Sequence, residues 1–115
     1  MWMAMLALGA ALLCGGAAAA EDVAGDAAHG RQVFMTVGCY QCHGTVGQGS
    51  VQSGPRLAPE PMPLASMVQL LRQPLNQMPA YSAKTLSDRD VADIHAYLAS
   101  IPQPPALKDI KLLNY

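Results

Sequence analysis

Two cysteines and a histidine in one short segment constrain this chain more than any other feature. Cys39 and Cys42 are separated by Tyr40 and Gln41, and His43 follows directly. On a helical turn this spacing brings two thiols to the separation of the two vinyl groups of haem. The adjacent imidazole then comes up under the iron as its proximal ligand. The segment therefore predicts one covalently attached haem c.

The same pair of thiols leaves other chemistry open. A thioredoxin-like dithiol also has this spacing, but nothing in the sequence resembles the alternating buried strands of that fold. A zinc site needs four ligands, and neither His29 nor His95 has ligand spacing to the motif. A disulfide between residues three apart would be strained. A non-haem redox or metal-binding module that uses Cys39 and Cys42 remains an alternative.

The first 20 residues carry no charged side chain, and residues 2–13 form a continuous apolar run. Ala18 and Ala20 supply small residues at the −3 and −1 positions of a cleavage site before Glu21. The run is short for a membrane span. We therefore predict a signal peptide over residues 1–20, export to the periplasm, and no membrane span after cleavage. Because no Lys or Arg precedes the run, an uncleaved anchor stays open as the alternative.

The rest of the composition indicates one soluble domain over residues 21–102. Seven Lys and Arg face eight Asp and Glu, with no basic run, which argues against a nucleic-acid partner. Charged residues make up 13% of the chain and hydrophobic residues 51%, a balance that argues against a disordered chain.

Hydrophobic periodicity and capping residues predict three helices. Asp26 is a candidate N-cap for a helix that runs to about Val37, and Phe34 on its apolar face would pack against the last helix. Gly30 inside this helix indicates close packing. Residues 63–73 have helical spacing of apolar side chains. Ser87 resembles the start of a capping box for the last helix, whose apolar face holds Val91, Ile94, Leu98 and Ile101.

Residues 44–59 are rich in Gly, Ser and Pro, which predicts a long loop that needs a partner to wrap. A ligating His usually donates its other ring N–H to a carbonyl, and Pro55 is our candidate for that carbonyl. Leu57 would contact the haem face. Arg56 would either pair with a haem propionate or lie solvated on the surface.

A second axial ligand is expected on the opposite haem face. Met78 lies in an irregular segment between two predicted helices and is followed by Pro79, which suits a thioether held in a fixed place. The sequence therefore predicts His43 and Met78 as the iron ligands. The other residues with a suitable donor atom are Met35, Met62, Met67, His29 and His95.

Four segments occur in an order that resembles class I (mono-haem) cytochromes c, in particular the small bacterial periplasmic type. These segments are residues 38–44, 54–57, 78–81 and 86–98, and the resemblance covers about residues 26–102. It implies an all-α cytochrome c fold, with three to four helices wrapped around one covalent haem and the terminal helices crossing near Phe34 and Tyr97. It also implies ligation by His43 and Met78. The predicted mature chain departs from the family in having no Trp.

With both axial positions filled, no site remains for a substrate, so we predict one-electron transfer and no enzymatic activity. The expected donor is a periplasmic dehydrogenase, of which the chain could be the cytochrome subunit, and the expected acceptor is a cytochrome or an oxidase of the respiratory chain. The alternative is a haem protein with an open sixth site, either a peroxidase or a gas sensor.

Residues 103–115 form a Pro-rich and then apolar tail beyond the predicted domain. Pro favours an extended path there. The apolar residues after it either pack back on the domain or dock on a partner enzyme, and we favour docking.

Overall fold

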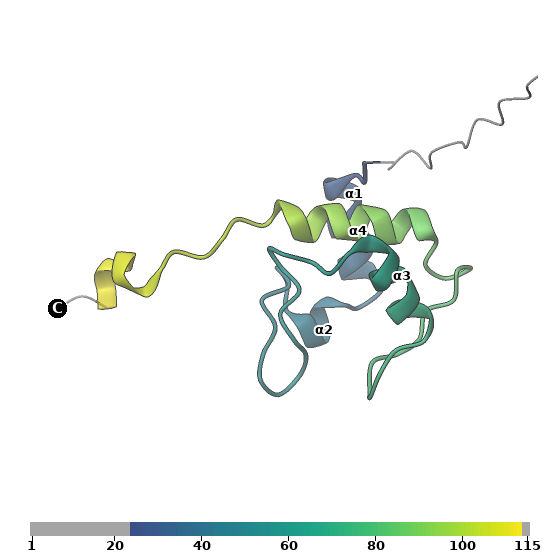
Figure 1. The fold of residues 1–115 in the computed structure, drawn as a ribbon, viewed down its shortest axis with the longest axis horizontal. Helices are drawn as coiled ribbons and strands as arrows, with labels where there is room; N and C mark the ends of the chain where they lie inside the picture. Colours follow the sequence, from purple (N-terminus) through teal and green to yellow (C-terminus); the bar gives the residue numbers. More distant parts are fainter. Residues whose placement is uncertain (1–23, 114–115) are drawn as a thin grey trace, which may run out of the picture.

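The computed structural model describes residues 24–113, so the predicted leader, residues 1–20, lies outside the described residues. Within the described part, the chain is helical and contains no named strand. The elements in order are α1 (Ala27–Thr36), α2 (Tyr40–His43), α3 (Leu64–Arg72) and α4 (Asp88–Ser100), followed by two 3-10 turns, η1 (Leu107–Asp109) and η2 (Lys111–Leu113) (Figure 1). The prediction of an all-α fold is confirmed.

Helix α1 begins and ends where the local sequence predicts. The Asp26 side chain accepts hydrogen bonds from the backbone N–H groups of Ala28 and His29, which fill two of the unpaired donors at a helix start. At the other end Gly38 has a φ of 87°, and the Cys39 N–H donates to the Phe34 carbonyl at 3.1 Å. This is the 6→1 bond of a Schellman motif, with a left-handed Gly after the C-cap. It ends α1 directly before the first cysteine of the motif.

Helix α4 begins with the predicted capping box. The Ser87 hydroxyl accepts from the Asp90 N–H, and the Asp90 carboxylate accepts from the Ser87 N–H at 3.0 Å. The Ser87 hydroxyl also donates to the Asp90 carboxylate at 2.7 Å. This bond most of all, and then the bond from the Ser87 N–H, lowers the pKa of Asp90. The ionised carboxylate also suits the positive end of the helix dipole.

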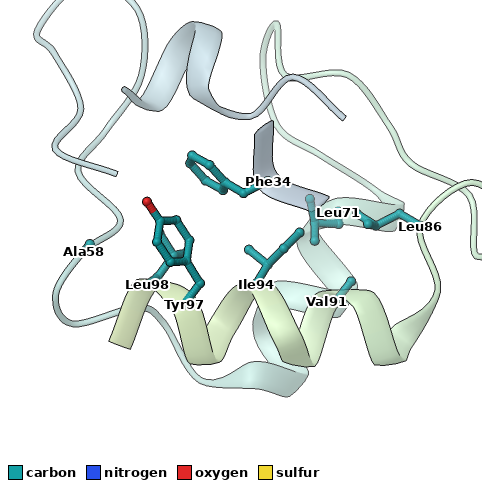
Figure 2. Packing of buried hydrophobic residues seen from close by; sticks show 8 residues of the cluster. All are labelled: Phe34, Ala58, Leu71, Leu86, Val91, Ile94, Tyr97 and Leu98. Atoms are coloured by element: carbon teal, nitrogen blue, oxygen red, sulfur yellow. The ribbon is translucent and has the colours of Figure 1, made fainter. Parts of the chain in front are cut away.

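The core forms where α1 crosses α4. The rings of Phe34 and Tyr97 meet edge to face, with centroids 5.6 Å apart and planes at 61°, so the predicted crossing is confirmed. In Figure 2, Phe34 faces Tyr97, while Ile94 and Val91 point from α4 toward Leu71 of α3. The largest fully buried side chains are Phe34, Leu86, Ile94, Leu98 and Val91.

In the described part of the C-terminal tail, the two 3-10 turns lie apart from the domain. Residues 102–106 are extended, and η1 and η2 pack on each other well away from the four α-helices (Figure 1). Leu107, Leu112 and Leu113 are exposed. Near the start of the tail, the Gln103 side-chain amide donates to Glu60 at 3.1 Å. Within residues 103–113 the apolar side chains of the tail thus lie apart from the four helices, and docking on a partner stays a prediction.

None of the helices within residues 24–113 has the length and hydrophobicity that crossing a membrane requires.

Candidate functional site

Both cysteines of the motif are free thiols at the single helical turn α2. Cys39 is the N-cap of this turn and is half-buried, whereas Cys42 is exposed. Burial raises the pKa of the Cys39 thiol to about 11. The sulfur is thus uncharged at neutral pH, and a thioether at this position would be uncharged too. The buried environment of Cys39 is therefore compatible with a free thiol and with a thioether.

The imidazole of His43 is buried and held in one orientation. Its Nδ1 atom lies 2.9 Å from the carbonyl oxygen of Pro55, the partner that the sequence analysis assigned to it. A carbonyl oxygen can only accept a hydrogen bond, so Nδ1 must carry the proton. The neutral ring then keeps its lone pair on Nε2, which is the state that a metal ligand requires.

The loop over residues 44–58 is tied to this turn by backbone contacts. The Gly49 N–H donates to the His43 carbonyl at 2.8 Å, and the Ser53 hydroxyl donates to the Cys42 carbonyl at 2.7 Å. A Cβ atom at Gly54 would lie 3.0 Å from His43 Nδ1 and from the Cys42 carbonyl oxygen. A side chain at position 54 would therefore require the loop or the imidazole to shift by a few tenths of an ångström.

The two residues after Pro55 differ in their surroundings. Arg56 is exposed, which is compatible with either of the two roles predicted for it. Leu57 is half-buried and packs against the core cluster, and its N–H donates to the Gly47 carbonyl at 2.8 Å. Leu57 is therefore fixed to the loop that holds the imidazole.

Met78 lies in the segment between α3 and α4, residues 73–87. Its side chain is half-buried and packs against the core cluster. In Figure 1 this segment extends to the same side of α4 as α2 and the loop over residues 44–58. The chain thus supplies a thioether on a segment separate from the one that supplies the imidazole.

The other histidines that could act as ligands are engaged elsewhere. His29 Nδ1 donates to the Asp93 carboxylate at 2.8 Å, and His95 Nε2 donates to the Met62 carbonyl at 3.0 Å. Of the other methionines, Met35 and Met67 lie on helices α1 and α3 and pack against the core, and Met62 is exposed.

Tyr81, three residues after Met78, brings this segment close to the cysteine motif. Its hydroxyl donates to the Val37 carbonyl at 2.9 Å. Desolvation raises the pKa of the Tyr81 phenol, and negative charge on Cys39 and Cys42 raises it further. The bond to Val37 connects the Met78 segment to the residue two positions before Cys39.

Sequence reasoning missed three side chains that position these segments. It named Tyr81 as part of a motif without a role, and it gave no role to Arg72 or Asp93. Arg72 donates to the Tyr81 carbonyl at 2.9 Å. Tyr81 and Asp93 bind groups 44 or more residues away, and Arg72 binds a carbonyl nine residues away. Of the three, only Arg72 carried a signal in the sequence, its charge near the end of an apolar helix.

The comparison with protein families decides between the haem and non-haem interpretations. Residues 25–98 match the family described as Cytochrome C oxidase, cbb3-type, subunit III. The chain belongs to this family. It is a c-type cytochrome, similar to the mono-haem class I proteins, and its cofactor is a covalently bound haem c. Neither the curated proteins nor the solved structures gave a match.

The residues of this cytochrome fit the cofactor that the family implies. Two free thiols lie on one helical turn, and the adjacent buried imidazole keeps its lone pair on Nε2. Among residues 24–113, no three His, Cys, Asp or Glu side chains gather as they would around a metal ion bound directly by the protein. A cytochrome c domain implies electron transfer through haem between redox partners, and an electron carrier rather than an enzyme.

Proposed function

We propose that this cytochrome carries one electron at a time through a haem c whose iron is bound by His43 and Met78. The observation that carries this proposal is the hydrogen bond from His43 Nδ1 to the Pro55 carbonyl, which leaves Nε2 as the ligating atom. The engagement of His29 with Asp93 and of His95 with the Met62 carbonyl favours Met78 as the second ligand. A neutral thioether favours Fe(II) and raises the reduction potential.

Each candidate residue has a separate task in this proposal. Cys39 and Cys42 would hold the haem through thioether bonds, and Leu57 would contact its face. Exposed Arg56 would pair with a propionate. Bound haem c supplies a one-electron redox couple. The protein keeps the ligands in one arrangement, so little rearrangement accompanies the change in charge.

The partners in this proposal are a periplasmic dehydrogenase as donor and a cytochrome or an oxidase as acceptor. The description of the matched family names an oxidase, which supports a respiratory acceptor. Tyr40 within the motif and Val46 three residues after it are partly exposed, which supports an apolar contact with a partner there. The formal net charge of −1 gives weak electrostatic steering, which favours a stable dehydrogenase subunit over a freely diffusing carrier.

The proposal also includes export of the chain by its leader and docking of its C-terminal tail on a partner. The apolar leader over residues 1–20 supports delivery to the periplasm. The tail over residues 103–115 would serve as a docking segment for the partner enzyme. Its exposed leucines and its extended start support that role, because exposed apolar side chains are usual where a partner covers them.

The visible spectrum of the exported protein tests the ligand assignment. The oxidised protein is expected to be low-spin and to have the weak long-wavelength band of a Met–Fe(III) bond. Met78→Ala should abolish this band, whereas Met62→Ala, which truncates an exposed methionine, should leave it unchanged. A high-spin spectrum in the unmodified protein would overturn the proposal and would favour an open sixth site, to be tested with peroxide and gaseous ligands.

A further inference from the structure

We propose that Tyr81 and Arg72 are positioning residues that hold the Met78 segment where its thioether can bind the iron. This inference rests on the proposed function, because it concerns the segment that would supply the distal ligand. Neither Tyr81 nor Arg72 binds the iron in this proposal, but each has a measurable effect on the iron–sulfur bond.

Tyr81 is fixed through both backbone groups and its side chain. Its N–H donates to the Leu71 carbonyl at 2.9 Å, and its carbonyl accepts from Arg72 at 2.9 Å. Its hydroxyl donates to the Val37 carbonyl, also at 2.9 Å. The residue therefore bridges the last turn of α3 and the end of α1.

The contact with Val37 connects the Met78 segment to the cysteine motif. Val37 is the C-cap of α1, and Cys39 follows two residues later. The Cys39 N–H is itself bonded to the Phe34 carbonyl. The Tyr81 hydroxyl thus fixes the Met78 segment to a rigid part of the backbone that also carries the first thiol.

The short chain between Met78 and Tyr81 transmits this restraint. Three residues span at most about 10 Å when fully extended, and Pro79 fixes one of the backbone angles between the two. Once Tyr81 is anchored, Met78 can sample only a small volume. Loss of an anchor would let the thioether move away, and an external ligand could then compete for the iron.

Arg72 adds a second restraint from the side of α3. Its side chain is only 21% exposed, and it contacts both the Tyr81 carbonyl and the Asp88 carboxylate. Asp88 is the first residue of α4 and its side chain is largely exposed. A substitution at Asp88 can therefore remove the ion pair while the bond from Arg72 to Tyr81 remains.

Tyr97 provides a matched control for Tyr81. Its hydroxyl donates to the Thr45 carbonyl at 2.7 Å, so Tyr97→Phe also removes one bond from a phenol to a backbone carbonyl. That bond ties α4 to the loop after His43 and does not touch the Met78 segment. The two Tyr→Phe variants thus separate a general loss of stability from a specific effect on the distal side.

The experiment measures imidazole binding to the oxidised holoproteins by the change in the visible spectrum, together with thermal unfolding. We expect both Tyr81→Phe and Tyr97→Phe to unfold at lower temperature than the unmodified protein. Only Tyr81→Phe should bind imidazole more tightly, by about fivefold, the factor that corresponds to the ~1 kcal/mol of one hydrogen bond. Equal imidazole affinity in the two variants would overturn the inference.

A second pair of variants tests the restraint from α3. Arg72→Met keeps most of the side-chain length and removes the donor to the Tyr81 carbonyl, so it should also tighten imidazole binding. Asp88→Asn keeps that donor and should not. If Arg72→Met and Asp88→Asn changed the imidazole affinity equally, the positioning role of Arg72 would be contradicted. If the unmodified protein lacked the Met–Fe(III) band, the ligand assignment itself would fail, an outcome distinct from unchanged imidazole affinity in a protein that has the band.

Discussion

A Cβ atom on Gly30 would lie 1.9 Å from the backbone carbonyl oxygen of Asp93, far inside van der Waals contact. Gly25 meets the Ala92 carbonyl almost as closely, with 2.2 Å from a Cβ to the oxygen. The backbone at the start of α1, and just before it, thus lies in direct contact with the backbone of α4. The crossing that places Phe34 on Tyr97 depends on this close approach.

Gly30→Ala is therefore expected to destabilise the protein, although Ala is the better helix former by about 1 kcal/mol. The added methyl group would push the two helices apart and disturb the packing of Phe34. The measurement is the free energy of unfolding of the holoprotein in denaturant, where we expect a loss of about 1–3 kcal/mol. Gln32→Ala, at an exposed position of the same helix, should change it by less than about 0.5 kcal/mol. A stabilised Gly30→Ala variant would contradict the close approach.

Asp93 is a buried carboxylate that joins α4 to the start of α1. Desolvation by itself would raise its pKa, but hydrogen bonds from the Asp26 N–H and from His29, together with the charge of Arg89, hold the pKa below the usual value. A carboxyl whose pKa is depressed by folding contributes stability above its ordinary pKa. That stability is lost as the pH falls through the folded pKa.

Asp93→Asn should therefore lower the free energy of unfolding by about 1.5–3 kcal/mol at neutral pH, the range for hydrogen bonds to a charged group. The difference from the unmodified protein should shrink as the pH falls below about 4, the ordinary pKa of an Asp carboxyl in the unfolded chain. It should disappear once the pH is below the lowered pKa of folded Asp93. Denaturant unfolding over a pH series measures both effects. Asp109→Asn is the control, because the Asp109 side chain is largely exposed and pairs with an exposed Lys108. If the difference in the free energy of unfolding stayed constant down to the most acid pH, the stability would not come from the ionised Asp93 carboxylate.

Without the haem, the chain is expected to be largely unfolded. The described core has few fully buried large side chains, and a covalent haem would add a large apolar body to it. Circular dichroism of the Cys39→Ala/Cys42→Ala variant measures the helix content directly. Ser53→Ala is a suitable control, since it removes one hydrogen bond to the Cys42 carbonyl and keeps both thiols. Native helix content in the double variant would refute the expectation.

Removal of residues 104–115 should leave the stability of the domain unchanged within about 0.5 kcal/mol, because η1 and η2 lie apart from the four helices. Thermal unfolding of the truncated holoprotein measures this. The same truncation tests docking: if the tail binds the donor enzyme, reduction of the cytochrome by a periplasmic extract should slow. An unchanged rate of reduction would count against docking.

Local sequence was sufficient to predict the helices and the attachment segment. The caps at Asp26 and Ser87 bond to groups within three residues, and both occur as predicted. The crossing of Phe34 and Tyr97 was implied by the resemblance to class I cytochromes c and is confirmed. The roles assigned to Arg56, Leu57 and Met78 toward the haem stay predictions that the proposed experiments test.

The buried polar contacts could not be predicted in the same way. The Asp93 carboxylate binds groups 64 and 67 residues away in sequence, and the Tyr81 hydroxyl reaches a carbonyl 44 residues away. No periodicity or spacing marks such a pair, because the partner is a backbone group or a residue type that is common throughout the chain. The sequence also could not predict whether the tail packs on the domain, since an apolar sequence is compatible with both packing and exposure.

The sequence by itself thus determined the motif of two thiols and an imidazole, the helix limits and the apolar faces, because each depends on atoms within one or two helical turns. The tertiary structure decided which distant groups the Tyr81, Arg72 and Asp93 side chains bind, and which carbonyl lies against position 30. Those features arise only when α1 crosses α4 and the intervening segments come into contact with these helices. Their physical basis is contact between a backbone group and another backbone group or side chain elsewhere in the chain.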